Sequence, residues 1–300
     1  MKTPLTFIHT GAVAAAMLVC TIACKKDNSS STPSTADDQT TASLAAGATG
    51  SESIYDDTFD VVTQSSEQVG VSTKALEPGS SIGMTRSLNA DPLTSYVAVA
   101  CATVTLSPAD TTTFPKTMTI DYGTGCTSTN GITRVGKLVV TLTGKLRNPG
   151  STISVTFDNY SVNGYGLAGT YSITPVAGTS GALNYTIAIS NGSITTPSAA
   201  VYDYSCSETY TQVGGIGTST VTDDTYDITG NVTYSGGGLS VSGTIVTPLV
   251  RSTDCPNITT GTIDYVYNNI KGVLDFGSGT CDNVATVKVG PITNTITLPR

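Results

Sequence analysis

The chain contains no tryptophan, and its single histidine, His9, lies near the N-terminus. Beyond His9 there is no imidazole to activate a serine or cysteine nucleophile or to bind a metal ion. Charged residues are also scarce, at 12%, and the formal net charge is −8. This balance disfavours nucleic acid and anionic headgroups as ligands. We therefore expect no histidine-dependent catalysis, no cofactor and no nucleic-acid partner.

Long apolar runs are scarce as well, and the run near the N-terminus covers only residues 11–23. As a helix it would span roughly 20 Å, less than the ~30 Å hydrocarbon core of a bilayer. A small residue, Ala23, precedes Cys24, as in the cleavage site of a bacterial lipoprotein. We predict that residues 1–23 are a lipoprotein signal peptide and that Cys24 becomes the lipidated first residue. An ordinary secreted protein cleaved nearby is the alternative.

Residues 24–50 are rich in Ser, Thr, Ala and Gly, which predicts a flexible tether after the lipidated cysteine. Residues 51–93 are predicted to form a short helix and a loop. The helix should begin near Ser51 or Ser53, either of which can cap its N-terminus. Its apolar residues recur at helical spacing, at Tyr55, Phe59 and Val62.

From residue 94 to 300 the dominant period is two, which is typical of β-strands. Turn signals such as Asn163-Gly164, Asn191-Gly192 and Gly236-Gly237-Gly238 separate the alternating segments. We predict an all-β fold, an antiparallel β-sandwich or a barrel-like fold of many short strands, with one short N-terminal helix. The expected inward faces include Leu138/Val140/Leu142, Ile153/Val155/Phe157, Leu183/Tyr185/Ile187/Ile189 and Ala285/Val287/Val289.

The cysteines of this β region repeat a spacing. Cys101 lies 25 residues before Cys126, and Cys255 lies 26 residues before Cys281. We predict that each pair forms a disulfide that closes a hairpin, which suits an oxidising envelope compartment and suggests two similar parts. Cys206 is left over, and a buried unpaired thiol is the simplest interpretation.

Two glycine-cysteine segments carry a resemblance to known proteins. DYGTGC at residues 121–126 and DFGSGTCDN at residues 275–283 resemble a family of uncharacterised Bacteroidota envelope lipoproteins. Cys24-Lys25-Lys26-Asp27 also resembles the start of mature Bacteroidota lipoproteins. The resemblance implies an outer-membrane lipoprotein with a β domain, at the cell surface or on the periplasmic face, and it implies no activity.

Two groups of aspartates are candidates for chemistry. Asp56, Asp57 and Asp60 are expected on the polar side of the short helix, and Asp223, Asp224 and Asp227 form a second group. Paired acids can hydrolyse glycosides, and clustered carboxylates can hold Ca²⁺. Solvated charge is the simpler expectation for both groups. The second group is a weak calcium candidate, and otherwise no metal site is predicted.

Tyrosines offer a candidate ligand-binding surface. Tyr202, Tyr204 and Tyr210 share a strand face with Cys206 and Glu208, and Tyr265 and Tyr267 are a second candidate pair. A tyrosine row can stack on sugar rings or on a peptide, but packing in the protein core is the alternative.

A loop is predicted around Asp110-Thr111-Thr112, because Pro108 and Pro115 flank it. The three residues resemble the O-glycosylation acceptor of exported Bacteroidota proteins, which makes Thr111 a candidate acceptor.

Together these features predict a membrane-anchored envelope lipoprotein with a non-catalytic β domain. Its role would be structural or binding, with polysaccharide or another envelope protein as partner. The alternative is a carboxylate-dependent extracellular glycoside hydrolase, which needs two acids about 5–9 Å apart in a cleft. We lean away from an enzyme, because no environment that would tune such a pair is visible in the sequence.

Overall fold

The computed structural model describes residues 35–72, 98–99, 101–218 and 221–300. The predicted signal peptide, Cys24 and the loop at residues 73–93 lie outside these ranges. The described part contains one helix, α1 (Thr35–Gln68), fourteen strands and a short 3-10 helix, η1 (Thr179–Gly181). The strands are β1 (Thr103–Ser107), β2 (Lys116–Asp121), β3 (Cys126–Thr127), β4 (Thr133–Leu142), β5 (Ile153–Val162), β6 (Tyr165–Ala177), β7 (Leu183–Thr195), β8 (Val201–Gly214), β9 (Thr225–Gly236), β10 (Leu239–Ser252), β11 (Thr260–Tyr267), β12 (Ile270–Ser278), β13 (Val284–Val289) and β14 (Ile292–Thr297).

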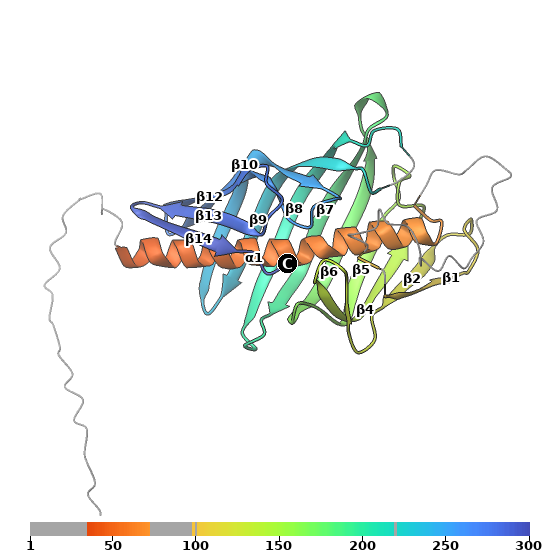
Figure 1. Ribbon diagram of the computed structural model, residues 1–300, viewed down its shortest axis with the longest axis horizontal. Coiled ribbons are helices and arrows are strands. Elements are labelled where there is room, and N and C mark those ends of the chain that lie inside the picture. Colours follow the sequence, from red (N-terminus) through yellow and green to blue (C-terminus); the bar gives the residue numbers. More distant parts are fainter. Residues whose placement is uncertain (1–34, 73–97, 100, 219–220) are drawn as a thin grey trace, which may run out of the picture. The chain divides into compact units, whose positions relative to one another are not determined.

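The strands form a single antiparallel sheet in which neighbours in sequence are neighbours in space. β3 is a short side branch that pairs with β4. β1 and β14 are the two edges in the described part of the chain, so the sheet is open rather than closed into a barrel. The predicted antiparallel all-β fold with one N-terminal helix is therefore confirmed. Figure 1 shows α1 running across one face of this sheet, where a second sheet would lie in a sandwich.

The turn signals have two different outcomes. Asn163 and Gly164 both have positive φ and join β5 to β6 as a two-residue turn, as predicted. Gly237 and Gly238 join β9 to β10 in the same way. Asn191-Gly192, in contrast, is not a turn, because it lies inside β7 where the register with β6 and β8 shifts. An Asn-Gly pair with positive φ at its Asn can form a bulge as well as a hairpin.

Inward faces of the strands form the core together with α1. The predicted inward residues are buried, except that Phe157 is half-buried against the core. Residues 51–63 of α1 are buried without interruption. No helix in the described ranges is both long enough and apolar enough to cross a membrane.

The helix begins sixteen residues earlier than the sequence predicted. It starts at Thr35, so residues 35–50, which we expected in the flexible tether, are helical. Many of their side chains are small, and Ala42, Ala45 and Ala48 are fully buried against the sheet. Small residues allow close approach of the helix to the strands. Gly47, for example, lies against the Tyr234 ring, and a Cβ there would be 2.6 Å from its hydroxyl oxygen.

Four hydroxyls on the buried part of α1 find acceptors within the helix, whereas those of Ser53, Thr58, Ser65 and Ser66 have none in the described part of the chain. Thr41, Thr49, Ser51 and Thr63 each donate a hydrogen bond to the carbonyl four residues earlier, at 2.8–2.9 Å. These bonds let a Ser/Thr-rich helix enter the core without leaving those hydroxyls unpaired. Ser51 is therefore an interior residue of the helix, and the predicted N-cap at Ser51 or Ser53 is wrong.

The two predicted cysteine pairs lie at disulfide distance, with Cα atoms 6.1 Å apart for Cys101–Cys126 and 5.8 Å apart for Cys255–Cys281. The first pair spans the β1–β2 hairpin and the second spans the β11–β12 hairpin. Each therefore closes the open end of a hairpin near one edge of the sheet. The two hairpins belong to one continuous sheet rather than to two separate parts.

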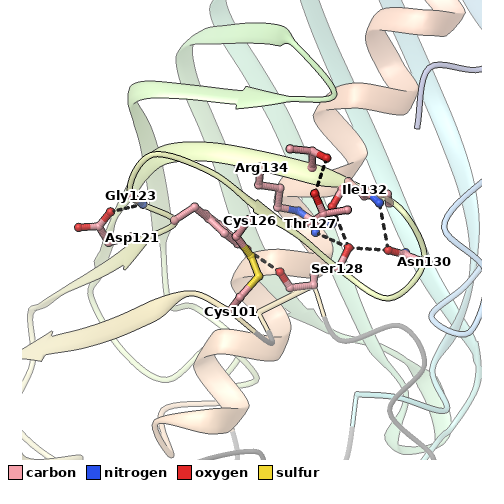
Figure 2. Close-up of a disulfide and its surroundings, with 12 residues drawn as sticks. Cys101, Asp121, Gly123, Cys126, Thr127, Ser128, Asn130, Ile132 and Arg134 are labelled. Atoms are coloured by element: carbon pink, nitrogen blue, oxygen red, sulfur yellow. Dashed lines mark hydrogen bonds between the residues drawn. A yellow bond between two sulfur atoms is a disulfide. The ribbon is translucent and has the colours of Figure 1, made fainter.

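The loop that follows Cys126 also positions a buried arginine. Figure 2 shows Ser128 beside the first disulfide, where its hydroxyl donates to Asn130 and to the carbonyl of Ile132. The Arg134 Nη1 group donates to the same hydroxyl oxygen at 3.2 Å. The loop between β3 and β4 is therefore hydrogen-bonded to the start of β4, from which Arg134 enters the core.

Candidate functional site

The first group of aspartates is buried, not solvated. Asp57 on α1 is fully buried, and Asp56 and Asp60 expose only 6% and 8% of their surface. The expectation of a solvated polar helix face is wrong, because the sheet covers that face and supplies cationic partners. Removing an unpaired carboxylate from water would cost several kcal/mol.

Asp57 and Arg134 form the most completely bonded pair. Arg134 donates from Nε to Asp57 Oδ2 at 2.7 Å and from Nη2 to Oδ1 at 2.5 Å. The Tyr160 hydroxyl donates to Oδ2 at 2.9 Å. Burial alone would raise the pKa of Asp57, but the facing Arg134 guanidinium and these hydrogen bonds lower it to about 2. Asp57 is therefore ionised at neutral pH.

Two further arginines complete the buried charge network. Arg251 on β10 pairs with Asp56 at 2.9 Å and with Asp60 at 2.6 Å. Arg300 pairs with Asp57 at 3.3 Å and also with Asp60. Together with Arg134 this makes three aspartates that face three arginines. The network ties the middle of α1 to β4, β10 and the C-terminal residue.

Two more carboxyls are buried, Glu52 on α1 and Glu208 on β8. Glu52 Oε2 and Glu208 Oε1 have no hydrogen-bond partner within the described residues. Burial, with a smaller contribution from Asp56, raises the pKa of Glu208 to about 8. Burial and the nearby Glu208 carboxyl raise the pKa of Glu52. Glu208 is therefore held largely in the neutral form at pH 7, and the pKa of Glu52 is shifted in the same direction.

The space beside these acids is too small for a substrate. A cavity of about 10 Å³ borders Glu52, Ser53, Asp56 and Asn257. That volume corresponds to roughly one water molecule. The acids of α1 thus converge in the core, and this cavity offers no room for a sugar ring between them.

The second group of aspartates does not form a calcium site. Asp224 is fully buried and accepts hydrogen bonds from Arg147 at 2.9 Å and from Tyr226 at 2.8 Å. Asp223 instead accepts a bond from Thr218, while Asp227 lies along β9. No group of three or more His, Cys, Asp or Glu residues in the described ranges could hold a metal ion. The weak calcium prediction is therefore wrong.

Three of the candidate tyrosines belong to the core beneath α1. The Tyr204 ring stacks on the ring of Tyr55 of the helix, with the two ring centroids 5.4 Å apart. The Tyr210 hydroxyl donates to Asp56 at 2.9 Å, and the Tyr265 hydroxyl lies 3.2 Å from the Thr49 hydroxyl. These tyrosines pack the helix against the sheet, so they are not a ligand surface. Cys206 on the same strand face is buried and unpaired, as predicted.

Tyr202 has a different environment from these three. Its ring is half-buried and stacks on Tyr234 at 5.1 Å, with an interplanar angle of 19°. It lines an open groove of about 730 Å³ between the first turns of α1 and strands β8 to β10. The groove is lined by Ala36, Gln39, Thr40, Ser43, Leu44, Ala200, Val201, Tyr202, Tyr234, Gly236, Gly237 and Leu239. Tyr267 is half-buried and is not part of this lining.

The candidate glycosylation residue lies in the predicted loop between β1 and β2. Asp110 organises the loop by accepting hydrogen bonds from the Thr112 and Thr113 amides at 2.8 and 2.6 Å. The buried Lys116 ammonium donates to the Pro108 carbonyl at 3.0 Å beneath it. Thr112 and Thr113 are exposed, whereas Thr111 is half-buried near Gly70.

The groove is of substrate size, and the sequence did not predict it. The sequence offers Tyr202 as a candidate, but five other lining residues belong to the part of α1 where the sequence predicts a tether. Comparison with known protein families, curated proteins and solved structures finds no match to this chain. Geometry and chemistry therefore carry the functional argument.

Proposed function

We propose that this chain is a membrane-anchored envelope lipoprotein whose β domain is a non-catalytic binding module. In this proposal residues 1–23 are removed, Cys24 is lipidated, and the domain is presented at the outer membrane, on the cell surface or the periplasmic face. The ligand site is the groove between the start of α1 and strands β8 to β10. The partner is a polysaccharide or another envelope protein.

The observation that carries the proposal is the separation of the groove from the acids. At about 730 Å³ the groove has the size of known small-molecule sites. No residue that lines it, among those described, is an acid, a base or a nucleophilic cysteine. Asp56, Asp57 and Asp60 are instead held by arginines in the core. This arrangement favours binding over the alternative of a carboxylate-dependent glycoside hydrolase.

A bulky substitution in the groove tests the site. Ser43 is exposed on α1 and lines the groove, so Ser43→Phe should fill it without disturbing the core. We expect the neutral apolar dye N-phenyl-1-naphthylamine to bind the wild type and to bind Ser43→Phe at least about tenfold more weakly. Ser207→Phe, at an exposed position of β8 outside the groove, is the matched control. Equal dye affinity in Ser43→Phe and Ser207→Phe would refute the groove as the binding site.

We further propose that Thr111 carries an O-linked glycan in the native host. The ordered loop and its exposed neighbours support this, because added bulk there would stay in solvent. Intact-mass spectrometry of the natively expressed protein tests it. A Thr111 peptide found only at its unmodified mass would refute the modification.

A further inference from the structure

We infer that the groove binds a neutral, hydroxyl-rich ligand, namely pyranose units of an uncharged polysaccharide, with the Tyr202 ring as the stacking surface. The inference rests on the proposed function and specifies its ligand. It follows from the charge of the groove, the support of Tyr202, and the polar groups that face the ligand.

The lining carries no charged side chain. A phosphate, sulfate or uronate ligand would require arginine or lysine donors, because desolvating an anion without them is costly. A cationic ligand would require carboxylates for the same reason. The mature chain is acidic overall, which further disfavours an anionic polysaccharide. The remaining ligand class is neutral.

The position of the groove disfavours an extended peptide as the ligand. β8, β9 and β10 are interior strands, each paired on both sides, so they offer no free backbone edge for strand addition. A folded protein partner would need about 800 Å² of contact surface on each side, in a broad face rather than a groove.

Tyr202 is held in a defined orientation. One face of its ring stacks on Tyr234, and the backbone of Gly236 lies so close to the ring that a side chain there would clash with it. Tyr234 is itself seated against Gly47 of α1. An aromatic ring fixed in this way loses little conformational entropy when a sugar ring stacks on it.

Polar groups on α1 face the same groove. Gln39 and Ser43 are exposed and four residues apart, so they lie on one side of the helix. An amide and a hydroxyl can both donate and accept hydrogen bonds, which matches the donor-acceptor character of sugar hydroxyls. Leu44, Val201 and Leu239 supply apolar surface for the ring carbons.

The absence of tryptophan makes a direct experiment available. Tyr202→Trp keeps an aromatic ring in the groove and creates the only tryptophan of the chain. We expect its fluorescence to shift with at least one of cellohexaose, xylohexaose, mannohexaose and maltohexaose, and not with oligogalacturonate. Tyr267→Trp, at a half-buried tyrosine outside the groove, is the matched control and should show no shift. Tyr202→Ala should weaken binding of the same sugar about tenfold in calorimetry.

The possible outcomes separate this inference from the proposed function. If the apolar dye binds the groove while none of the neutral sugars does, the ligand class is wrong and the binding site stands. Preferential binding of oligogalacturonate would also overturn the inference. If sugars bind equally to wild type, Tyr202→Ala and Ser43→Phe, they bind elsewhere, and both the groove and its ligand are refuted.

Discussion

At the scale of residues, the central feature is the set of charges buried between α1 and the sheet. Arg134 lies on the same buried face of β4 as Leu138, and Arg251 lies on the same buried face of β10 as Leu249. An arginine at an inward position of a strand needs a carboxylate partner. The alternation of these strands already places both arginines at inward positions, so the sequence contained this signal. The aspartates of α1 are those partners, and their positions fix the rotation and register of the helix.

Breaking one of these pairs should be strongly destabilising. Arg134→Met leaves Asp57 with only Arg300 and Tyr160, so we expect a loss of about 3–5 kcal/mol in the free energy of unfolding. The double variant Asp57→Leu/Arg134→Met removes both charges and should lose less than the sum of the single variants. Urea denaturation of the four proteins measures the cycle. Additive losses would show that the pair does not interact.

Glu208 should make the stability depend on pH. Its pKa is about 8 in the folded protein and near 4.5 when exposed, so the folded state binds the proton more tightly. The contribution of Glu208 to stability is therefore greatest below pH 4.5 and is lost as the pH rises from 4.5 to 8, with a slope of up to ~1.4 kcal/mol per pH unit. Glu52 contributes in the same direction. Glu208→Gln should flatten the slope, whereas Asp282→Asn, at an exposed acid, should not. An unchanged slope in Glu208→Gln would contradict the buried neutral carboxyl.

At the scale of elements, local pattern predicted the strands well and the helix poorly. Alternation identified the inward faces of β4, β5, β7 and β13 because each strand has one face in the core. The sequence predicts a helix that begins only at residue 51, because residues 35–50 lack an apolar stripe. Their burial depends on alanines, a glycine and hydroxyls that bond within the helix. That environment exists only once the sheet has formed, so composition alone indicated a linker.

The hairpin disulfides should raise the free energy of unfolding by restricting the unfolded chain. Each closes a loop of 25 or 26 residues, which gives roughly 3.5 kcal/mol per bond by the chain-entropy estimate. We expect Cys255→Ala/Cys281→Ala to lower the free energy of unfolding by up to this amount.

Non-reducing peptide mapping should recover Cys101 with Cys126 and Cys255 with Cys281, and Cys206 should be alkylated only after unfolding. A crosslink from Cys206 to any of the four would contradict the pairing.

At the scale of the whole molecule, the α1 side of the groove and the proposed anchor are close in sequence. The groove lining begins at Ala36, and the predicted lipidated residue is Cys24. Durable attachment to a membrane needs at least two acyl chains or an equivalent second signal. The N-terminus of a lipoprotein supplies these chains. One side of the proposed binding site therefore comes from the segment that follows the predicted lipidated cysteine in the sequence.

The anchor itself is tested by substitution. Cys24→Ser should abolish palmitate labelling and release the protein from the membrane fraction. Cys20→Ser, at the other cysteine of the N-terminal segment, is the control and should still be labelled. Labelling that persists in Cys24→Ser would show that another residue is lipidated.

Hydrogen exchange of residues 42–49 tests the central claim most directly, because the groove exists only if the start of α1 is part of the folded domain. These residues include Ala42, Ala45 and Ala48, which are fully buried. Mass spectrometry of the mature protein should find their amides protected to the same degree as those of central strands such as β7 and β8. Exchange within seconds, as in a flexible tether, would contradict both the docked helix and the groove that it forms.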